Sequence, residues 1–207
     1  MSIFRNMNIL LASNNEHKKE EFSRILTGHT IVLPRELGID FDYEEDAETF
    51  TENALGKARA LASQAPEGYK ILADDSGLCI DALEGRPGVR TARYGLETFG
   101  RILESGERNE FLLKNMAHLE KKEERSAQFV CALAFVMDKR REFTFCETVD
   151  GFIAKESYGE GGFGYDPVFI VKEEGKTMAE LSDEEKDRYS HRGKASHHLI
   201  TLLGEIS

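Results

Sequence analysis

Apolar residues form short runs and helical stripes along the chain, and this pattern predicts both strands and helices. Three short runs, residues 8–12, 69–73 and 168–171, predict strands. Residues 126–137 are almost continuously apolar, as in a strand that is covered on both faces. Residues 142–149 then alternate Phe143 and Phe145 with Thr144 and Cys146, which favours a strand that pairs back on the previous one.

Helical spacing predicts further elements between these strands. Apolar residues recur every three or four positions in four segments, which are 18–26, 49–64, 109–119 and the stretch from 195 to 203. Residues 182–189 open with a capping-box pattern, Ser182 to Glu185, which predicts a further helix. Residues 38–48 are an acidic loop. The mixture predicts an α/β fold with a mixed sheet, because residues 126–149 read as a hairpin.

Composition narrows the function. The chain has 207 residues, 40% of them hydrophobic, and a formal net charge of -11. This length predicts one domain over residues 1–207, or two lobes that share one sheet. The negative charge argues against a nucleic-acid partner, because such proteins need a basic face. An anionic small molecule remains possible if a local basic cluster or a metal binds it.

The cysteines and the apolar runs favour a cytoplasmic protein. Cys79, Cys131 and Cys146 lie in apolar or strand-like stretches without metal-ligand spacing, so we expect buried, reduced thiols. The first residues lack a signal-peptide pattern. The longest strongly apolar run, residues 129–137, is too short to span a bilayer, so no membrane partner is expected.

Two acidic clusters suggest a metal. Asp74 and Asp75 follow an apolar run, where we expect the strand to end, and Ser76 and Gly77 come next. A second cluster lies in the acidic loop at residues 42–46. Two carboxylates from separate segments are typical of a Mg²⁺ site that is shared with substrate phosphates. Alone, each cluster could equally be a polar turn or a solvated loop.

Three other segments suggest nucleotide binding. Residues 13–18, "SNNEHK", form a polar turn before a helix, where free N–H groups favour a phosphate, although P-loop and GxGxxG motifs are absent. "GGFGYDP" at 161–167 allows close ligand approach and could stack Phe163 on a base. "SHRG" at 190–193 supplies the donors of Arg192. The structural alternatives are a plain helix cap, a hairpin turn with Phe163 in the core, and a basic loop between helices. His197 and His198 lack a partner at ligand spacing and do not suggest a metal.

In combination these motifs resemble the inosine triphosphatase family, the non-canonical purine nucleoside-triphosphate pyrophosphatases. The matching segments run in order from Ser13 to Ala195 and include "TFTENALGKA", "ADDSGLCIDALEGRPGVRTARY", "GGFGYDPVF" and "SHRGKA". The resemblance implies an elongated mixed sheet flanked by helices, two lobes with a nucleotide cleft between them, a homodimer and Mg²⁺. It also implies hydrolysis of ITP, dITP, XTP and dXTP to the monophosphate and pyrophosphate. Residues 94–110 depart from the family's usual run.

The resemblance also assigns roles by position. Glu44 and Asp75 would bind Mg²⁺, and Asp75 would be the general base. The triphosphate would bind at the start of the first predicted helix, to Ser13, Asn14, Asn15, Glu16, His17 and Lys18. The remaining nucleotide contacts would come from Ser76, Phe163, Gly164, Tyr165, Asp166, Lys186, His191 and Arg192.

Other functions remain as alternatives. A Maf-like pyrophosphatase would act on modified pyrimidine nucleotides, but the segments "FGYDP" and "SHRG" argue against it. A haloacid-dehalogenase-type phosphatase would need a DxDxT motif, which the chain lacks. A nucleotide-binding protein without turnover is the non-enzyme alternative, and the carboxylates at Glu44 and Asp75 argue against it.

Overall fold

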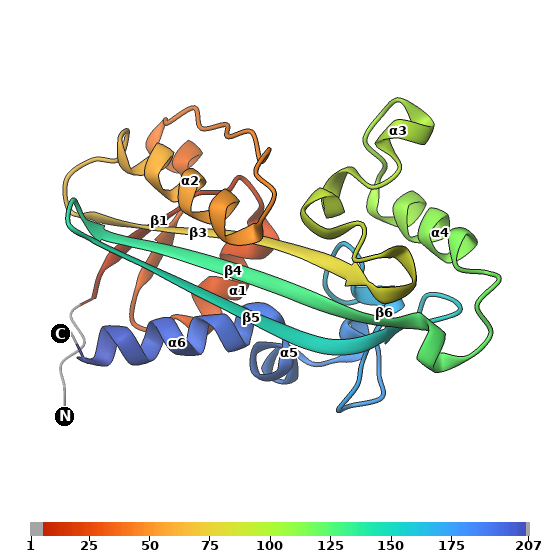
Figure 1. Ribbon diagram of the computed structural model, residues 1–207. Helices are drawn as coiled ribbons and strands as arrows, with labels where there is room; N and C mark the ends of the chain where they lie inside the picture. Colours follow the sequence, from red (N-terminus) through yellow and green to blue (C-terminus); the bar gives the residue numbers. More distant parts are fainter. Residues whose placement is uncertain (1–5, 206–207) are drawn as a thin grey trace. The chain divides into compact units, whose positions relative to one another are not determined.

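A computed structural model describes residues 6–205 of the chain (Figure 1), so the first five of the residues considered for a signal peptide lie outside it. The strands are β1 (Asn8–Leu11), β2 (Thr30–Val32), β3 (Tyr69–Ile80), β4 (Ser126–Asp138), β5 (Arg141–Ile153) and β6 (Phe169–Val171). The helices are α1 (Glu16–Ile25), α2 (Phe50–Ala62), α3 (Leu96–Phe99), α4 (Ser105–Asn115), α5 (Asp183–Tyr189) and α6 (His191–Glu205). None of these helices is long and apolar enough to cross a membrane.

The strands form one mixed sheet in the order β2-β1-β3-β4-β5-β6. β1 pairs in parallel with both β2 and β3, whereas β5 and β6 are antiparallel. The predicted α/β class, the mixed sheet and the neighbouring pair β4 and β5 are therefore confirmed. The sequence prediction missed β2, because its three residues are too few for a recognisable alternation.

The strand through the acidic pair is longer than predicted. We expected it to end at Asp74, but β3 continues through Asp74, Asp75 and Ser76 to Ile80. Successive side chains of a strand point to opposite faces. Asp74 and Asp75 therefore meet different partners, and the backbone stays extended through the polar run.

The chain divides into two compact units, and the divisions fall within or at the ends of β3, β4, β5 and α6. Unit 1 holds the described residues up to Asp75, Cys131–Glu147 and the described residues from Arg192. Unit 2 holds Ser76–Val130 and Thr148–His191. The single domain predicted from length stays a prediction, and each unit is described below by itself.

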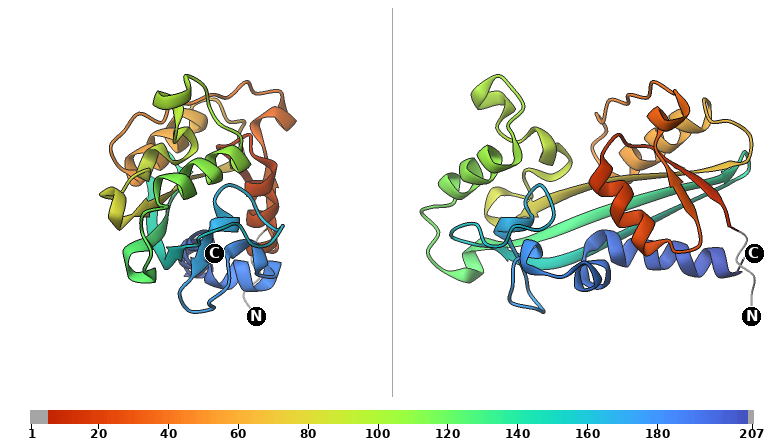
Figure 2. Two further views of the ribbon diagram at one scale, coloured as in Figure 1. Left: turned by 90° about the vertical axis from the view of Figure 1, so that its right-hand side faces the viewer. Right: turned by 180° about the vertical axis from the view of Figure 1, so that it is seen from behind.

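Unit 1 has helices on both faces of its strands. One apolar cluster packs Phe22 of α1 and Leu199 of α6 on Leu133 and Phe135 of β4. Another packs Ala54 and Ala58 of α2 on the alternate β4 residues, including Ala132 and Ala134. Figure 2 shows α1 in red and α6 in blue, which belong to the first layer, and α2 in orange, which belongs to the second. The prediction of cover on both faces is confirmed for residues 131–137, whereas Gln128 in the first part of the run is exposed.

Unit 2 has its own core. Leu112 and Met116 at the end of α4 pack with Phe129 of β4 and Phe169 of β6. The buried guanidinium of Arg125 donates to the carbonyls of Met116, Ile153 and Ala154, at 2.6–2.7 Å, and so ties the end of α4 to the end of β5. The predicted capping box is confirmed at α5, where Ser182 accepts from the backbone N–H of Glu185.

Two local predictions are wrong. Cys146 is exposed, because it lies on the alternate face of β5 from Phe143 and Phe145, which pack against the core; Cys131 is buried and Cys79 is half-buried. The loop expected at residues 190–193 is absent. Ser190 caps α5, and α6 begins at His191, so His191 and Arg192 lie in the first turn of a helix.

Candidate functional site

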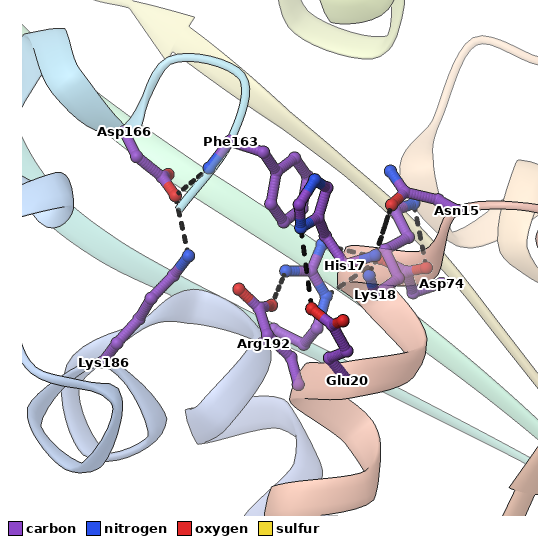
Figure 3. A network of polar contacts seen from close by, with 10 residues as sticks. Asn15, His17, Lys18, Glu20, Asp74, Phe163, Asp166, Lys186 and Arg192 are labelled. Atoms are coloured by element: carbon purple, nitrogen blue, oxygen red, sulfur yellow. Dashed lines mark hydrogen bonds and ion pairs between the residues drawn. The ribbon is translucent and has the colours of Figure 1, made fainter. Parts of the chain in front are cut away.

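The α1 start is a conventional helix cap with one additional contact. The Asn15 side chain accepts hydrogen bonds from the backbone N–H groups of His17 and Lys18. Ser13 accepts from the N–H of Asn15, and Asn14 donates to the Phe41 carbonyl. Lys18, unlike a solvated surface lysine, reaches Asp74 of β3, with its Nζ 3.0 Å from Oδ1 (Figure 3).

Asp74 lies at the centre of a buried charge network. Its side chain is fully buried, and besides Lys18 it contacts Arg192, whose Nη2 lies 3.1 Å from Oδ2. Arg192 is 3% exposed and also donates to Glu21 of α1. Two carboxylates thus face two cations, so the network carries no net charge, which is what burial of ionic groups requires.

This network sets the protonation states of its members. Burial alone would raise the pKa of Asp74, but Lys18 and Arg192 outweigh it and hold the pKa far below its usual range. Burial likewise opposes the charge on Arg192, while Glu21 and Asp74 raise its pKa. Asp74 therefore stays ionised and paired, and it is a poor proton acceptor.

Asp75 has a different environment, on the α2 side of the strand. It is 4% exposed and accepts a hydrogen bond from Asn53 of α2 at 2.9 Å. Burial, together with the nearby carboxylate of Glu45, raises the pKa of Asp75 to about 6. Lys57, one turn after Asn53, pairs with Glu45 and partly offsets this effect. A carboxylate with such a pKa is a capable general base near neutral pH.

The carboxylates here suit a divalent cation. Within residues 6–205 no group of three or more His, Cys, Asp or Glu side chains is arranged to hold a metal. A Mg²⁺ ion shared with substrate phosphates needs only one or two protein carboxylates. Asp75 and Glu45 could supply them, and the burial and second carboxylate that raise the pKa of Asp75 would favour further positive charge there. Glu44 is exposed, and its predicted metal contact stays a prediction.

The glycine loop of unit 2 is fastened around Phe163. Asp166 accepts from the backbone N–H of Phe163 at 3.0 Å and from Lys186 of α5 at 2.7 Å (Figure 3). The Lys186 ammonium also lies 5.2 Å from the centre of the half-buried Phe163 ring. Gly162 has a φ of +71°, and a Cβ there would collide with the Asp166 carboxylate, so this turn needs glycine.

The remaining predicted residues have varied surroundings. His191 is buried, and its ring stacks on Phe129 with centroids 4.7 Å apart. Ser76 is half-buried within β3. Glu16 and His17 are exposed and pair with Arg35 and Glu20. Within unit 1 the structure brings Lys18 and Arg192 to Asp74, and within unit 2 it brings Phe163 and Lys186 to Asp166.

The sequence analysis missed Glu21, Asn53 and Lys57, and it placed Glu45 only in the acidic cluster, without the effect on Asp75 that the structure gives it. The sequence did contain a signal for two of them. Asn53 and Lys57 are four residues apart and adjoin the apolar stripe of α2, so they lie on or beside the buried face of that helix.

Comparisons with known proteins show the family. Residues 9–202 match the model of the Ham1 family. The chain belongs to the Ham1 family. A dITP/XTP pyrophosphatase of Treponema denticola is 46% identical, with 91% of this chain and 94% of that protein covered. A dITP/XTP pyrophosphatase of Bacillus subtilis is 43% identical, with 94% of this chain and 96% of that protein covered.

Solved structures extend the likeness to the fold. The Ham1 protein of Staphylococcus aureus superposes with a TM-score of 0.82 at 39% identity, and the match covers 97% of this chain and all of that one. The α/β fold with its mixed sheet is thus that of the Ham1 proteins, as the resemblance implied.

Replacing Asp75 should stabilise the metal-free protein. The pKa of Asp75 is higher in the folded state, so its contribution to stability is full below the unfolded pKa near 3.8 and is lost as pH rises through about 6. Asn stays neutral and can still accept from Asn53. We expect Asp75→Asn in EDTA to gain about 1–3 kcal/mol at pH 7.5 and about half of that gain at pH 5. Thermal melts at both pH values measure this, and a lower Tm at both would contradict it.

Replacing the adjacent Asp74 should have the opposite effect. Asp74→Asn leaves Lys18 and Arg192 buried with too little negative charge, which costs about 3–5 kcal/mol. The pKa of Asp74 is lowered in the folded state, so its stabilisation is present above the unfolded pKa and is lost only in strong acid. The loss should therefore be equal at pH 5 and pH 7.5. Urea unfolding of the two variants side by side tests the contrast, and equal effects would refute it.

Proposed function

We propose that this protein hydrolyses the non-canonical purine nucleoside triphosphates ITP, dITP, XTP and dXTP to the monophosphate and pyrophosphate, and so removes them from the nucleotide pool. The observation that carries the proposal is Asp75, a buried carboxylate with a raised pKa beside Glu45 and Lys57. Family membership and relatives named dITP/XTP pyrophosphatase support this reaction and substrate class.

The reaction breaks the anhydride bond between the α and β phosphates. Asp75 takes a proton from the attacking water, whose oxygen forms the new bond to phosphorus, and pyrophosphate leaves with the bridging oxygen. Such a base contributes about 10²–10⁴-fold to the rate. Lys18 and Lys57 would offset the charge of the phosphates, and residues 13–17 would supply further polar contacts to them.

A divalent cation would complete the phosphate site. We propose Mg²⁺, bound by Asp75 together with Glu45 or the predicted Glu44. When bound, it would neutralise charge on the phosphates and on the leaving pyrophosphate. The surroundings of Asp75 support this, since burial and a second carboxylate make its ionised form costly without a cation.

The base contacts would come from Phe163, Lys186, His191 and Arg192. Phe163 would stack on the purine, which does not distinguish one base from another. A donor-only side chain can bond the six-oxo group of inosine and xanthine but not the six-amino group of adenine. Arg192 was predicted for this task, although at least three of its N–H donors already face Asp74 and Glu21. The other nucleotide contacts would come from Ser76, Gly164, Tyr165 and Asp166. We also propose that the protein forms the predicted homodimer.

The alternatives are a Maf-like activity on modified pyrimidine nucleotides and binding without turnover. The family match argues against the former. The poised base at Asp75 argues against the latter.

The Asp75→Asn variant tests the reaction. We expect the wild-type protein with Mg²⁺ to release pyrophosphate, not orthophosphate, from ITP. The variant should lose at least about 100-fold in kcat with little change in KM, because it loses the base but keeps its shape. Quantifying pyrophosphate and orthophosphate separately checks both points. Unchanged turnover in the variant would move the base elsewhere, and no hydrolysis by the wild type would leave only the binding function.

The Arg192→Lys variant tests base selection. Lysine keeps a positive charge for Asp74 and Glu21 but loses the planar fork. If Arg192 reads the six-oxo group, the ratio of kcat/KM for ITP to that for ATP should fall by at least about 10-fold. If the arginine serves only the buried network, the Tm falls while the ratio stays constant, and discrimination lies elsewhere. Measuring both quantities on one preparation separates these results.

A further inference from the structure

The glycine loop has a second contact that holds it, besides those of Asp166, and this contact comes from α4. Asn109 in α4 is 4% exposed, and its Nδ2 donates to the carbonyl of Gly164 at 3.0 Å. Asp166 already holds the N–H of Phe163. The peptide group before Phe163 and the one after Gly164 are therefore held by side chains of the same unit.

The next residue of the loop is also fastened. Tyr165 is buried, and its hydroxyl donates to the carbonyl of Thr91 at 3.1 Å. The guanidinium of Arg108, adjacent to Asn109, lies 5.3 Å from the centre of the Tyr165 ring. Arg108 itself is held by the carbonyl of Ala92 at 2.9 Å. Two consecutive residues of α4 thus contact two consecutive residues of the loop.

Stability alone does not account for Asn109. No hydrogen-bond donor in the described part of the chain reaches its buried Oδ1. A buried acceptor without a partner is unfavourable, and an apolar side chain of similar shape would remove that burden. What leucine could not supply is the bond to Gly164. The chain therefore keeps a polar group at this place although its only described side-chain bond goes to the loop.

We propose that Asn109 is a positioning residue that holds the Gly164 carbonyl and thereby presents the Phe163 ring to the substrate base. This rests on the proposed function, in which Phe163 stacks on the purine. A pre-organised ring loses less conformational freedom on binding than a mobile one. Stacking is equally available to every purine, so loss of Asn109 should weaken ITP, XTP and ATP alike.

The chain offers a direct probe of the loop, because it contains no tryptophan. Phe163→Trp makes a single emitter at the position in question, and its fluorescence anisotropy and quenching by acrylamide report loop mobility without any nucleotide. The matched control is Asn115, on the same helix, whose Nδ2 donates to the hydroxyl of Tyr94 at 2.9 Å and not to the loop.

We expect Asn109→Leu in the Phe163→Trp protein to raise acrylamide quenching and lower anisotropy, while Asn115→Leu leaves both unchanged. With Phe163 restored, Asn109→Leu should raise KM for ITP and ATP by the same factor, about 3- to 10-fold, which is the range of one neutral hydrogen bond. The kcat should stay within about 2-fold, because uniform binding is lost. Asn109→Ala repeats the measurement if leucine prevents folding.

Equal quenching in the Asn109 and Asn115 variants would overturn the proposal, as would an unchanged KM for ITP in Asn109→Leu. A purely structural role would lower the Tm and leave loop mobility and KM as in the control. Failure of the proposed function would look different. The Phe163→Trp parent and the wild type would then fail to bind or hydrolyse ITP, whatever Asn109→Leu does to the loop.

Discussion

The alternation of side chains along β3 separates two adjacent carboxylates, and the chemistry of unit 1 depends on that separation. Asp74 faces Lys18 and Arg192, and Asp75 faces Asn53 and the Glu45 carboxylate. Asp74 is therefore held in its ionised form, whereas Asp75, one position later, is a carboxylate with a pKa of about 6. On a single face the two carboxylates would lie closer together and repel each other more strongly.

The surroundings of Asp74 and those of Asp75 also differ in their contribution. The former stabilise the fold, and the latter suit the proposed activity. The network of Lys18, Glu21, Asp74 and Arg192 carries no net charge, so removing one member leaves an uncompensated charge. The surroundings of Asp75 make its charge costly, because burial and the Glu45 carboxylate raise its pKa and Lys57 offsets only part of this effect. Active sites commonly retain such unfavourable charge, which substrate or metal then relieves.

Unit 2 solves a different problem, the fixation of a glycine-rich loop. Gly162 and Gly164 both have positive φ, which would leave the Phe163 ring mobile without further contacts. Side chains from two helices restrict the loop. Lys186 of α5 donates to Asp166, and Asn109 of α4 donates to the Gly164 carbonyl.

The sequence by itself determined the elements and most of the residue types of the site. Apolar runs and periodicity were sufficient for β1, β4, α1 and α2, and the Ser182–Glu185 pattern was sufficient for the capping box of α5, because these signals are local to one element. The motifs around Asp75, Phe163 and Arg192 were likewise recognisable, since each is a short continuous segment. Tertiary structure alone decided which side chains meet. The continuation of β3 past Asp75, the partners of Asp74, the place of Glu45 beside Asp75 and the hold of Asn109 on Gly164 all join residues that are 20 or more positions apart. Such contacts depend on how sheet and helix faces pack, and a local pattern of residues carries no record of that packing.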